Sequence, residues 1–169
     1  MAKWGDVDFR QLKELQERIN NMLSFDKDAF CQDVARELAQ RLYRKVVKRT
    51  PTGDYEPITY TKKDGTEITY NENKKGGTLK KGWAVKSVTR DGNSYVCEVI
   101  NPVEYASYFE YGHRQQPGRF VPQIGKRLKS GWAEGKFVLT ISEKEIQSIA
   151  PKLIEKRLQE KLREMMNDQ

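Results

Sequence analysis

The sequence predicts an α+β fold, in which a small antiparallel sheet packs against a long helix in the N-terminal half and a C-terminal helix, with a projecting hairpin and a long basic loop. Three observations lead to this prediction. Apolar residues recur every four positions from residue 30 to 46, and again at helical spacing after residue 142. Between these segments, short stretches alternate apolar and polar residues around Asp-Gly pairs. The 169 residues, 37% of them hydrophobic, suit one modest domain.

The first part of the chain is expected to be helical. Residues 9–23 carry apolar side chains at helical spacing and would form a helical extension. A longer helix is expected from about Lys27 to Arg49, with Asp26 as its N-cap. Thr50-Pro51 should end this helix, because proline disfavours helical backbone in the residue before it.

Two hairpins are expected next. The first spans residues 54–77 and turns at Asp64-Gly65 between two alternating stretches. Glycines bound it on both sides, so we expect it to project from the fold and to be dispensable for folding. The second spans about residues 83–100 and turns at Asp91-Gly92, and a short aromatic helix after it should end at Gly112.

The remaining residues predict a loop, a strand and a helix. Residues 113–136 contain prolines and glycines among basic residues, so we expect an arm without a regular element that becomes ordered on assembly. Alternating apolar residues over 137–141 predict a strand. A capping box that starts at Ser142 predicts a C-terminal helix over 142–169, kinked or restarted at Pro151.

These elements make one domain, 1–169. Its parts are an N-terminal helical extension (1–25), the long helix (26–53), the inserted hairpin (54–77), the sheet with the short helix and the basic loop (78–141), and the C-terminal helix (142–169).

Charge is unevenly distributed along the chain. Lys and Arg number 31 and Asp and Glu 24, which gives a net charge of +7. Residues 74–90 and 113–136 are basic, whereas residues 54–73 and 91–112 are acidic. Alternating blocks of opposite sign suit a surface that meets either a second copy of itself or a charged partner.

The sequence lacks the motifs that an enzyme or a metal site needs. The one histidine, His113, has no neighbouring Cys or second His, and neither a nucleotide-binding loop nor a hydrolase elbow occurs. Cys31 and Cys97 indicate neither a disulfide scaffold nor zinc. No apolar run approaches the roughly 20 residues of a membrane span, and the N-terminus has no apolar signal core. We expect no reaction, cofactor, metal or membrane.

Two other function classes remain open on the residues alone. A basic DNA-binding accessory protein would use the basic blocks for phosphates and the aromatic residues for base stacking. A nuclease would use the carboxylates of the first hairpin, although their pattern is that of an ordinary solvent-facing strand.

Several short motifs follow one another along the chain. They are Thr50-Pro51-Thr52-Gly53, Gly77-Thr78-Leu79-Lys80-Lys81-Gly82-Trp83, Asn101-Pro102-Val103-Glu104-Tyr105-Ala106, Glu110-Tyr111-Gly112-His113-Arg114, Phe120-Val121 and Gly135-Lys136-Phe137. In this order they resemble the tail-completion, or head–tail joining, proteins of long-tailed bacteriophages, prophages and phage-tail-like bacteriocins. The resemblance spans about Val34 to the C-terminus. The helix before Asp26 lies outside it, and the segment 54–76 interrupts the usual pattern.

The resemblance implies a structural role. Such a subunit is a small α+β domain that forms a ring, commonly of six copies, on top of the tail tube, where it ends the tail and presents a surface to the neck. The implied partners are further copies of the chain, the tail tube, neck or head-completion proteins, and DNA passing through the lumen. The implied location is the tail–neck junction of a virion or phage-tail-like particle that is made in the bacterial host cytoplasm.

We expect the ring and tube contacts to use the basic arm, the short helix and the projecting hairpin. The contact residues expected in the arm and around the short helix are Arg114, Arg119, Phe120, Lys126, Arg127, Trp132, Glu104, Tyr105, Glu110 and His113. Those expected in the hairpin are Tyr60, Lys62, Lys63, Asp64, Gly65 and Tyr70. Each subunit of a ring meets the next through two different faces, so complementary charge is expected between those faces.

Overall fold

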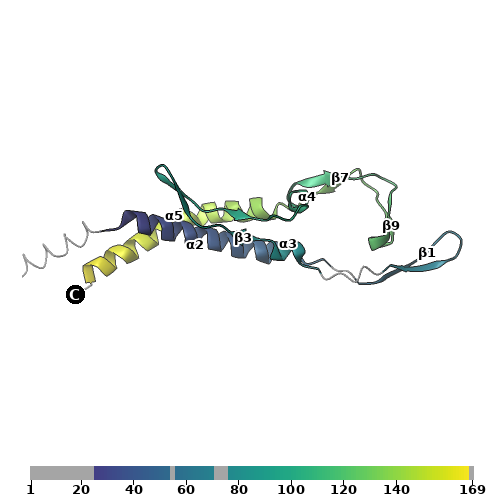
Figure 1. The fold of residues 1–169 in the computed structure, drawn as a ribbon, viewed down its shortest axis with the longest axis horizontal. Coiled ribbons are helices and arrows are strands. Elements are labelled where there is room, and N and C mark those ends of the chain that lie inside the picture. The colour runs from purple at the N-terminus through teal and green to yellow at the C-terminus, as the bar shows by residue number, and fades with distance from the viewer. Residues whose placement is uncertain (1–24, 54–55, 71–75, 168–169) are drawn as a thin grey trace, which may run out of the picture.

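The computed structural model describes residues 25–53, 56–70 and 76–167. Two long helices, α2 (Lys27–Arg49) and α5 (Val138–Asn167), lie side by side in an elongated molecule (Figure 1). Three hairpin-like arms extend from this pair, which confirms the predicted α+β class. The helix predicted over 9–23 lies outside the described residues.

Local signals set both ends of α2, as predicted. The Asp26 carboxylate accepts a hydrogen bond from the Ala29 amide at 2.9 Å and so caps the first turn. The rings of Phe25 and Phe30 pack 5.5 Å apart on either side of this cap. At the other end, Thr50 donates from its amide to the Val46 carbonyl, and its extended backbone leaves the helix. The predicted helix from Lys27 to Arg49 is confirmed.

The first hairpin forms with the predicted turn. β1 (Ile58–Thr61) pairs antiparallel with β2 (Glu67–Tyr70). Gly65 takes a φ of +84° in the turn, a conformation that glycine adopts without strain. Figure 1 shows this hairpin at the end of the molecule opposite the start of α2.

The second hairpin also forms, in two short ladders. After α3 (Thr78–Lys81), β3 (Ala84–Val85) pairs with β6 (Val99–Ile100), and β4 (Thr89–Asp91) pairs with β5 (Ser94–Val96). Throughout the described residues each strand pairs with a strand of its own hairpin, so the sheet content consists of five separate two-stranded ladders. Strands of two to four residues offer few backbone groups for a further neighbour.

The third arm follows α4 (Ala106–Tyr111), the predicted short helix. In this arm β7 (Gly112–Arg114) pairs with β10 (Trp132–Glu134), and β8 (Phe120–Val121) pairs with β9 (Lys126–Arg127). A single turn of 3₁₀ helix, η1 (Pro122–Ile124), forms its tip. We call residues 112–134 the β-arm.

The expectation that this segment lacks a regular element is wrong. Its backbone pairs continue between the two ladders, where the Gln115 amide donates to the Gly131 carbonyl and the Leu128 amide donates to the Arg119 carbonyl. Pro117 and Pro122 lie outside the ladders, where their missing N–H groups leave no pairing gap.

The C-terminal helix begins earlier than predicted. α5 starts at Val138, so the strand predicted over 137–141 and the helix start at Ser142 are both wrong. The Ser142 hydroxyl donates to the Val138 carbonyl at 2.7 Å, within the helix and not at a cap. The helix continues without a break through Pro151, so the predicted restart does not occur there.

The core lies where α2, α5 and the second hairpin meet. Val46, Trp83 and Val138 are buried together, one from each of these parts. Beside this core, Lys45 and Arg49 each pair with Glu145 at 2.6 Å, and hydrogen bonds from Lys45 and then Arg49 lower the pKa of Glu145.

The described residues leave much apolar surface uncovered. Seven hydrophobic side chains are buried among them, whereas twelve large hydrophobic side chains remain exposed. A chain with so small a core and so much exposed apolar surface is suited to association with other proteins.

Candidate interaction surfaces

The Thr-Pro and Gly-Trp motifs meet in the core. The Trp83 indole N–H donates to the Thr50 hydroxyl at 2.8 Å, and that hydroxyl donates to the Val46 carbonyl at 2.7 Å. A buried indole N–H needs such an acceptor. These two motifs therefore attach the second hairpin to the end of α2 and stabilise the fold.

The Asn-Pro motif fixes α3 in a similar way. The Asn101 side chain donates to the Leu79 carbonyl at 2.8 Å and accepts from the Val103 amide at 3.2 Å. A Cβ atom at position 82 would lie 2.6 Å from the Asn101 side-chain oxygen, so this close approach requires Gly82.

Glu110 lies inside the subunit. Its carboxylate accepts hydrogen bonds from the Leu139 and Thr140 amides, at 2.9 and 2.8 Å, and from the Thr140 hydroxyl at 2.8 Å. A carboxylate at this position satisfies the free N–H groups of the first turn of α5 and complements the helix dipole. A Cβ atom at Gly135 would be 2.2 Å from the Glu110 carbonyl oxygen, so the two segments pack directly against each other. Glu110, expected at a subunit contact, is thus a structural residue that holds α5.

An exposed aromatic face surrounds α4. It consists of Tyr105, Tyr108, Tyr111, Trp132 and Phe137, whose exposed fractions run from 44% to 61%. The rings of Tyr111 and Phe137 lie 6.5 Å apart. Large aromatic side chains are enriched in protein interfaces, and a cluster of them on a subunit surface indicates an interaction site.

The expected contact residues divide around this face. Tyr105 and Trp132 belong to it, and His113 borders it, with its ring 5.6 Å from that of Tyr108. Glu104 is exposed next to Tyr105. Tyr108, Tyr111 and Phe137 are not among the expected contact residues, although the i, i+3 spacing of the first two places them on one side of a short helix.

A second surface forms where the first hairpin meets the β-arm. The Tyr60 ring packs edge-on against Phe120, with ring centroids 4.9 Å apart. The Arg127 guanidinium lies 6.0 Å from the centre of the Phe120 ring and donates to the Gly118 carbonyl at 2.7 Å. The resulting basic cleft has a volume of about 600 Å³ and is lined by Tyr60, Thr61, Lys62, Lys63, Asp64, Phe120, Gly125, Lys126 and Arg127.

Most of the hairpin and arm residues that the sequence singled out therefore share one cleft. Four of the others lie elsewhere: Gly65 in the hairpin turn, Tyr70 at the end of β2, Arg114 at the base of the β-arm, and exposed Arg119 beside β8.

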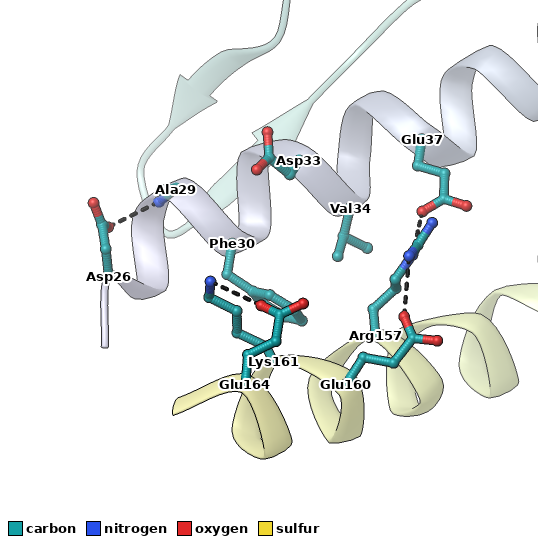
Figure 2. A pocket seen from close by; sticks show the side chains of 10 residues that line it. All are labelled: Asp26, Ala29, Phe30, Asp33, Val34, Glu37, Arg157, Glu160, Lys161 and Glu164. Atoms are coloured by element: carbon teal, nitrogen blue, oxygen red, sulfur yellow. Dashed lines mark hydrogen bonds and ion pairs between the residues drawn. The ribbon is translucent and has the colours of Figure 1, made fainter. Parts of the chain in front are cut away.

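A third surface, which was not predicted, is a groove between the N-terminal half of α2 and the C-terminal half of α5. It has a volume of about 490 Å³ and is lined by Asp26, Ala29, Phe30, Asp33, Val34, Glu37, Arg157, Glu160, Lys161 and Glu164. Figure 2 shows Phe30 and Val34 pointing from α2 toward α5, with charged side chains around them. Five acidic residues against two basic ones give this acidic groove a net charge of −3.

Arg157 crosses the acidic groove and ties its walls together. Its guanidinium pairs with Glu37 of α2 at 2.7 Å and with Glu160 of its own helix at 3.0 Å (Figure 2). Hydrogen bonds from Arg157 and then from Arg41 lower the pKa of Glu37 to about 2. Hydrogen bonds to Glu37 and then to Glu160 raise the pKa of Arg157. Both side chains are charged at neutral pH.

Neither a metal centre nor a membrane span emerges from the described segments. Within residues 25–53, 56–70 and 76–167, no group of three or more His, Cys, Asp or Glu side chains could hold a metal ion. Of the helices in that part of the chain, none is both long enough and apolar enough to cross a bilayer.

Comparison with known proteins identifies the family. A family model described as "Bacteriophage HK97-gp10, putative tail-component" matches residues 13–112, more than half of the chain. The match includes residues before Asp26, which the resemblance had left outside the family pattern. No curated protein and no solved structure matches the chain. Membership of a tail-component family indicates a place in the phage particle, in contact with other tail or head proteins. The chain belongs to the HK97-gp10-like family of bacteriophage tail components.

Proposed function

We propose that this tail component is a tail-completion, or tail-terminator, subunit. Copies of it form a homo-hexameric ring at the head-proximal end of the tail tube, and the ring joins the tail to the neck. The particle is a phage virion or a phage-tail-like bacteriocin.

The aromatic face around α4 is the observation that carries this proposal. Tyr108 and Tyr111 are 58% and 61% exposed, and Phe137 extends the face onto the start of α5. Glu110 and Gly135 lock α4 against α5, so the face is presented on a rigid support. A rigid aromatic surface is suited to a permanent contact with the tail tube or the next subunit.

Deleting the gene in its native particle tests the proposed function. We expect tails whose head-proximal end is undefined, seen in electron micrographs as variable tail lengths and as tails without heads. Wild-type protein supplied in trans should restore both properties, whereas the Tyr108→Ser/Tyr111→Ser variant should not. Val96→Ser, which alters an exposed apolar residue on β5, is the matched control and should restore them. Tails of normal length joined to heads in the deletion strain would contradict the proposal.

A DNA-binding accessory role is the second candidate, and the basic cleft favours it. Four basic side chains and one acidic side chain surround Tyr60 and Phe120 there, a combination that suits phosphates and stacked bases. Such a role predicts that the protein retards duplex DNA in gels with a steep salt dependence, and that Lys126→Glu/Arg127→Glu abolishes the shift. The tail-terminator proposal, in which DNA meets only the lumen of the assembled ring, predicts no such shift by the unassembled chain at physiological salt.

A further inference from the structure

The two ends of the molecule carry opposite charge. The acidic groove lies where α2 begins and α5 ends, and the tip of the β-arm lies near the other end of the long axis (Figure 1). An arm at one end cannot reach a groove at the other end of the same chain. Any contact between them therefore joins two copies.

The acidic groove has an apolar floor and a charged rim. Phe30 is half-buried and Val34 is buried, so the floor offers apolar surface to an inserted side chain. On the rim, Asp33 and Glu164 keep 72% and 62% of their side-chain surface exposed although each pairs with a basic neighbour on its own helix. Exposed ion pairs of this kind contribute little to stability, so a partner can displace them easily.

The tip of the β-arm has the complementary arrangement. Ile124 is 49% exposed in η1, at the point where the arm reverses direction. Lys126 and Arg127 in β9 follow it after Gly125, and Arg119 precedes β8; all three are exposed. The tip is thus an apolar side chain with three positive charges behind it.

We propose that the β-arm tip of one subunit inserts into the acidic groove of the next subunit. Ile124 contacts Phe30 and Val34 on the floor, while Arg119, Lys126 and Arg127 face the acidic rim. The contact joins two different surfaces, so it propagates head to tail and can close into a ring. The inference rests on the proposed function only for that ring, because the contact itself needs just two copies of the chain.

Charge reversal on each side tests this contact. The arm variant is Arg119→Glu/Lys126→Glu/Arg127→Glu, and the groove variant is Asp33→Lys/Glu160→Lys/Glu164→Lys, which changes the net charge of the groove from −3 to +3. Glu37 is left unchanged because it holds the two helices together. Sedimentation velocity over a concentration series should show each variant self-associating about tenfold or more weakly than the wild-type chain.

An equimolar mixture of the two variants gives the decisive result. The acidic arm of one then meets the basic groove of the other, and the unchanged arm of the second meets the unchanged groove of the first. Association should return to the wild-type level with alternating subunits, and raised salt should weaken it. Zero-length cross-linking of isotope-labelled with unlabelled wild-type chains should join Lys126 to Glu160 or Glu164 between chains.

Matched variants separate this contact from general effects of charge and fold. Lys48→Glu/Lys144→Glu/Lys152→Glu carries the same three reversals at exposed helical positions outside the groove, and should associate like the wild-type chain. Ile124→Asp should weaken association without changing the net charge of the groove. Circular dichroism should show the same helix content in all variants.

Several outcomes would overturn the inference. They are a wild-type chain that stays monomeric at every concentration, variants that associate like the control, and a mixture that fails to recover. Loss of DNA binding in the arm variant alone, with no change in self-association, would assign the arm to nucleic acid. If both variants complement the deletion strain normally, the arm–groove contact is wrong, whereas the tail-terminator role still stands. If instead the mixed variants associate but the protein is absent from assembled particles, the arm–groove contact stands and the tail-terminator role is wrong.

Discussion

The indole nitrogen of Trp83 lies 2.8 Å from the hydroxyl oxygen of Thr50, 33 residues earlier in the chain. Thr50 is the residue that ends α2, and its hydroxyl in turn donates a hydrogen bond to the Val46 carbonyl. This relay joins the last turn of α2 to the second hairpin inside the core. It also explains why the Thr-Pro and Gly-Trp motifs occur together in one sequence.

Replacing Thr50 should show how much this pair of hydrogen bonds contributes to the free energy of unfolding. Thr50→Val keeps the shape of the side chain but leaves the Trp83 N–H buried without an acceptor, at a cost of about 1–3 kcal/mol in the free energy of unfolding. The same substitution in a Trp83→Phe background should cost clearly less, since no N–H remains to be satisfied. Urea denaturation of the four proteins measures the coupling. Thr52→Val, at an exposed position, is the control, and equal costs in both backgrounds would contradict the relay.

Glu110→Ala should destabilise the start of α5. The Leu139 and Thr140 amides lose their acceptor, and we expect a loss of about 1–3 kcal/mol together with faster hydrogen exchange at these two amides. Glu110→Gln should lose less stability than Glu110→Ala, because the glutamine amide oxygen can still accept one of these hydrogen bonds. Glu104→Ala, an exposed acid near α4, should leave both quantities unchanged. If Glu110→Ala leaves exchange at Leu139 slow, the cap is not its role.

The Glu37–Arg157 pair should make stability depend on pH in the acid range. The pKa of Glu37 falls from an ordinary 4.5 to about 2 on folding, so the unfolded chain binds the proton more readily. The contribution is fully present above about pH 4.5 and is lost as the pH falls through about 2. The difference in unfolding free energy between wild type and Glu37→Gln should therefore be constant near neutral pH, at up to about 1 kcal/mol, and shrink between pH 4.5 and 2.

Urea denaturation at a series of pH values measures that difference. Glu67→Gln, on the exposed side of β2, serves as the control and should show a smaller pH dependence. A difference that grew as the pH fell would contradict the assignment of the shift to Glu37.

Removal of the first hairpin should leave a folded subunit. A Cβ atom at Gly76 would lie 2.1 Å from the Gly53 carbonyl oxygen, so the two ends of the insertion are adjacent and a short glycine–serine linker can replace 55–76. We expect cooperative thermal unfolding to persist, because the buried core lies between α2, α5 and the second hairpin. Loss of cooperativity would show that the hairpin belongs to the core.

The same deletion should loosen the β-arm. Tyr60 packs against Phe120, and Gly125 approaches the Ile58 side chain, so the amides of 120–127 should exchange faster without the hairpin. Tyr60→Ser alone should reproduce part of this change. A subunit that folds without the hairpin but fails to enter particles would identify the hairpin as a contact arm.

Elements whose signals are local can be predicted from the sequence alone. Asp26, the four-residue apolar repeat and Thr50-Pro51 all act within a turn of the residues they affect, and α2 begins and ends where they predict. Asp64-Gly65 and Asp91-Gly92 likewise set the two hairpins, since turn conformation depends on the residues in the turn. The order of the motifs pointed to a phage tail protein, and the family match agrees with it.

The remaining features could not be predicted from local signals, because they depend on residues far apart in the chain. Glu110 caps the start of α5 from 29 and 30 residues before the amides it binds. The sequence shows only the local capping pattern at Ser142, and that pattern predicts a later start of the helix. The acidic groove is closed by Arg157 and Glu37, 120 residues apart. Neither wall carries a local signal for the groove, which exists because α2 and α5 pack side by side and bring two separately ordinary charged faces together.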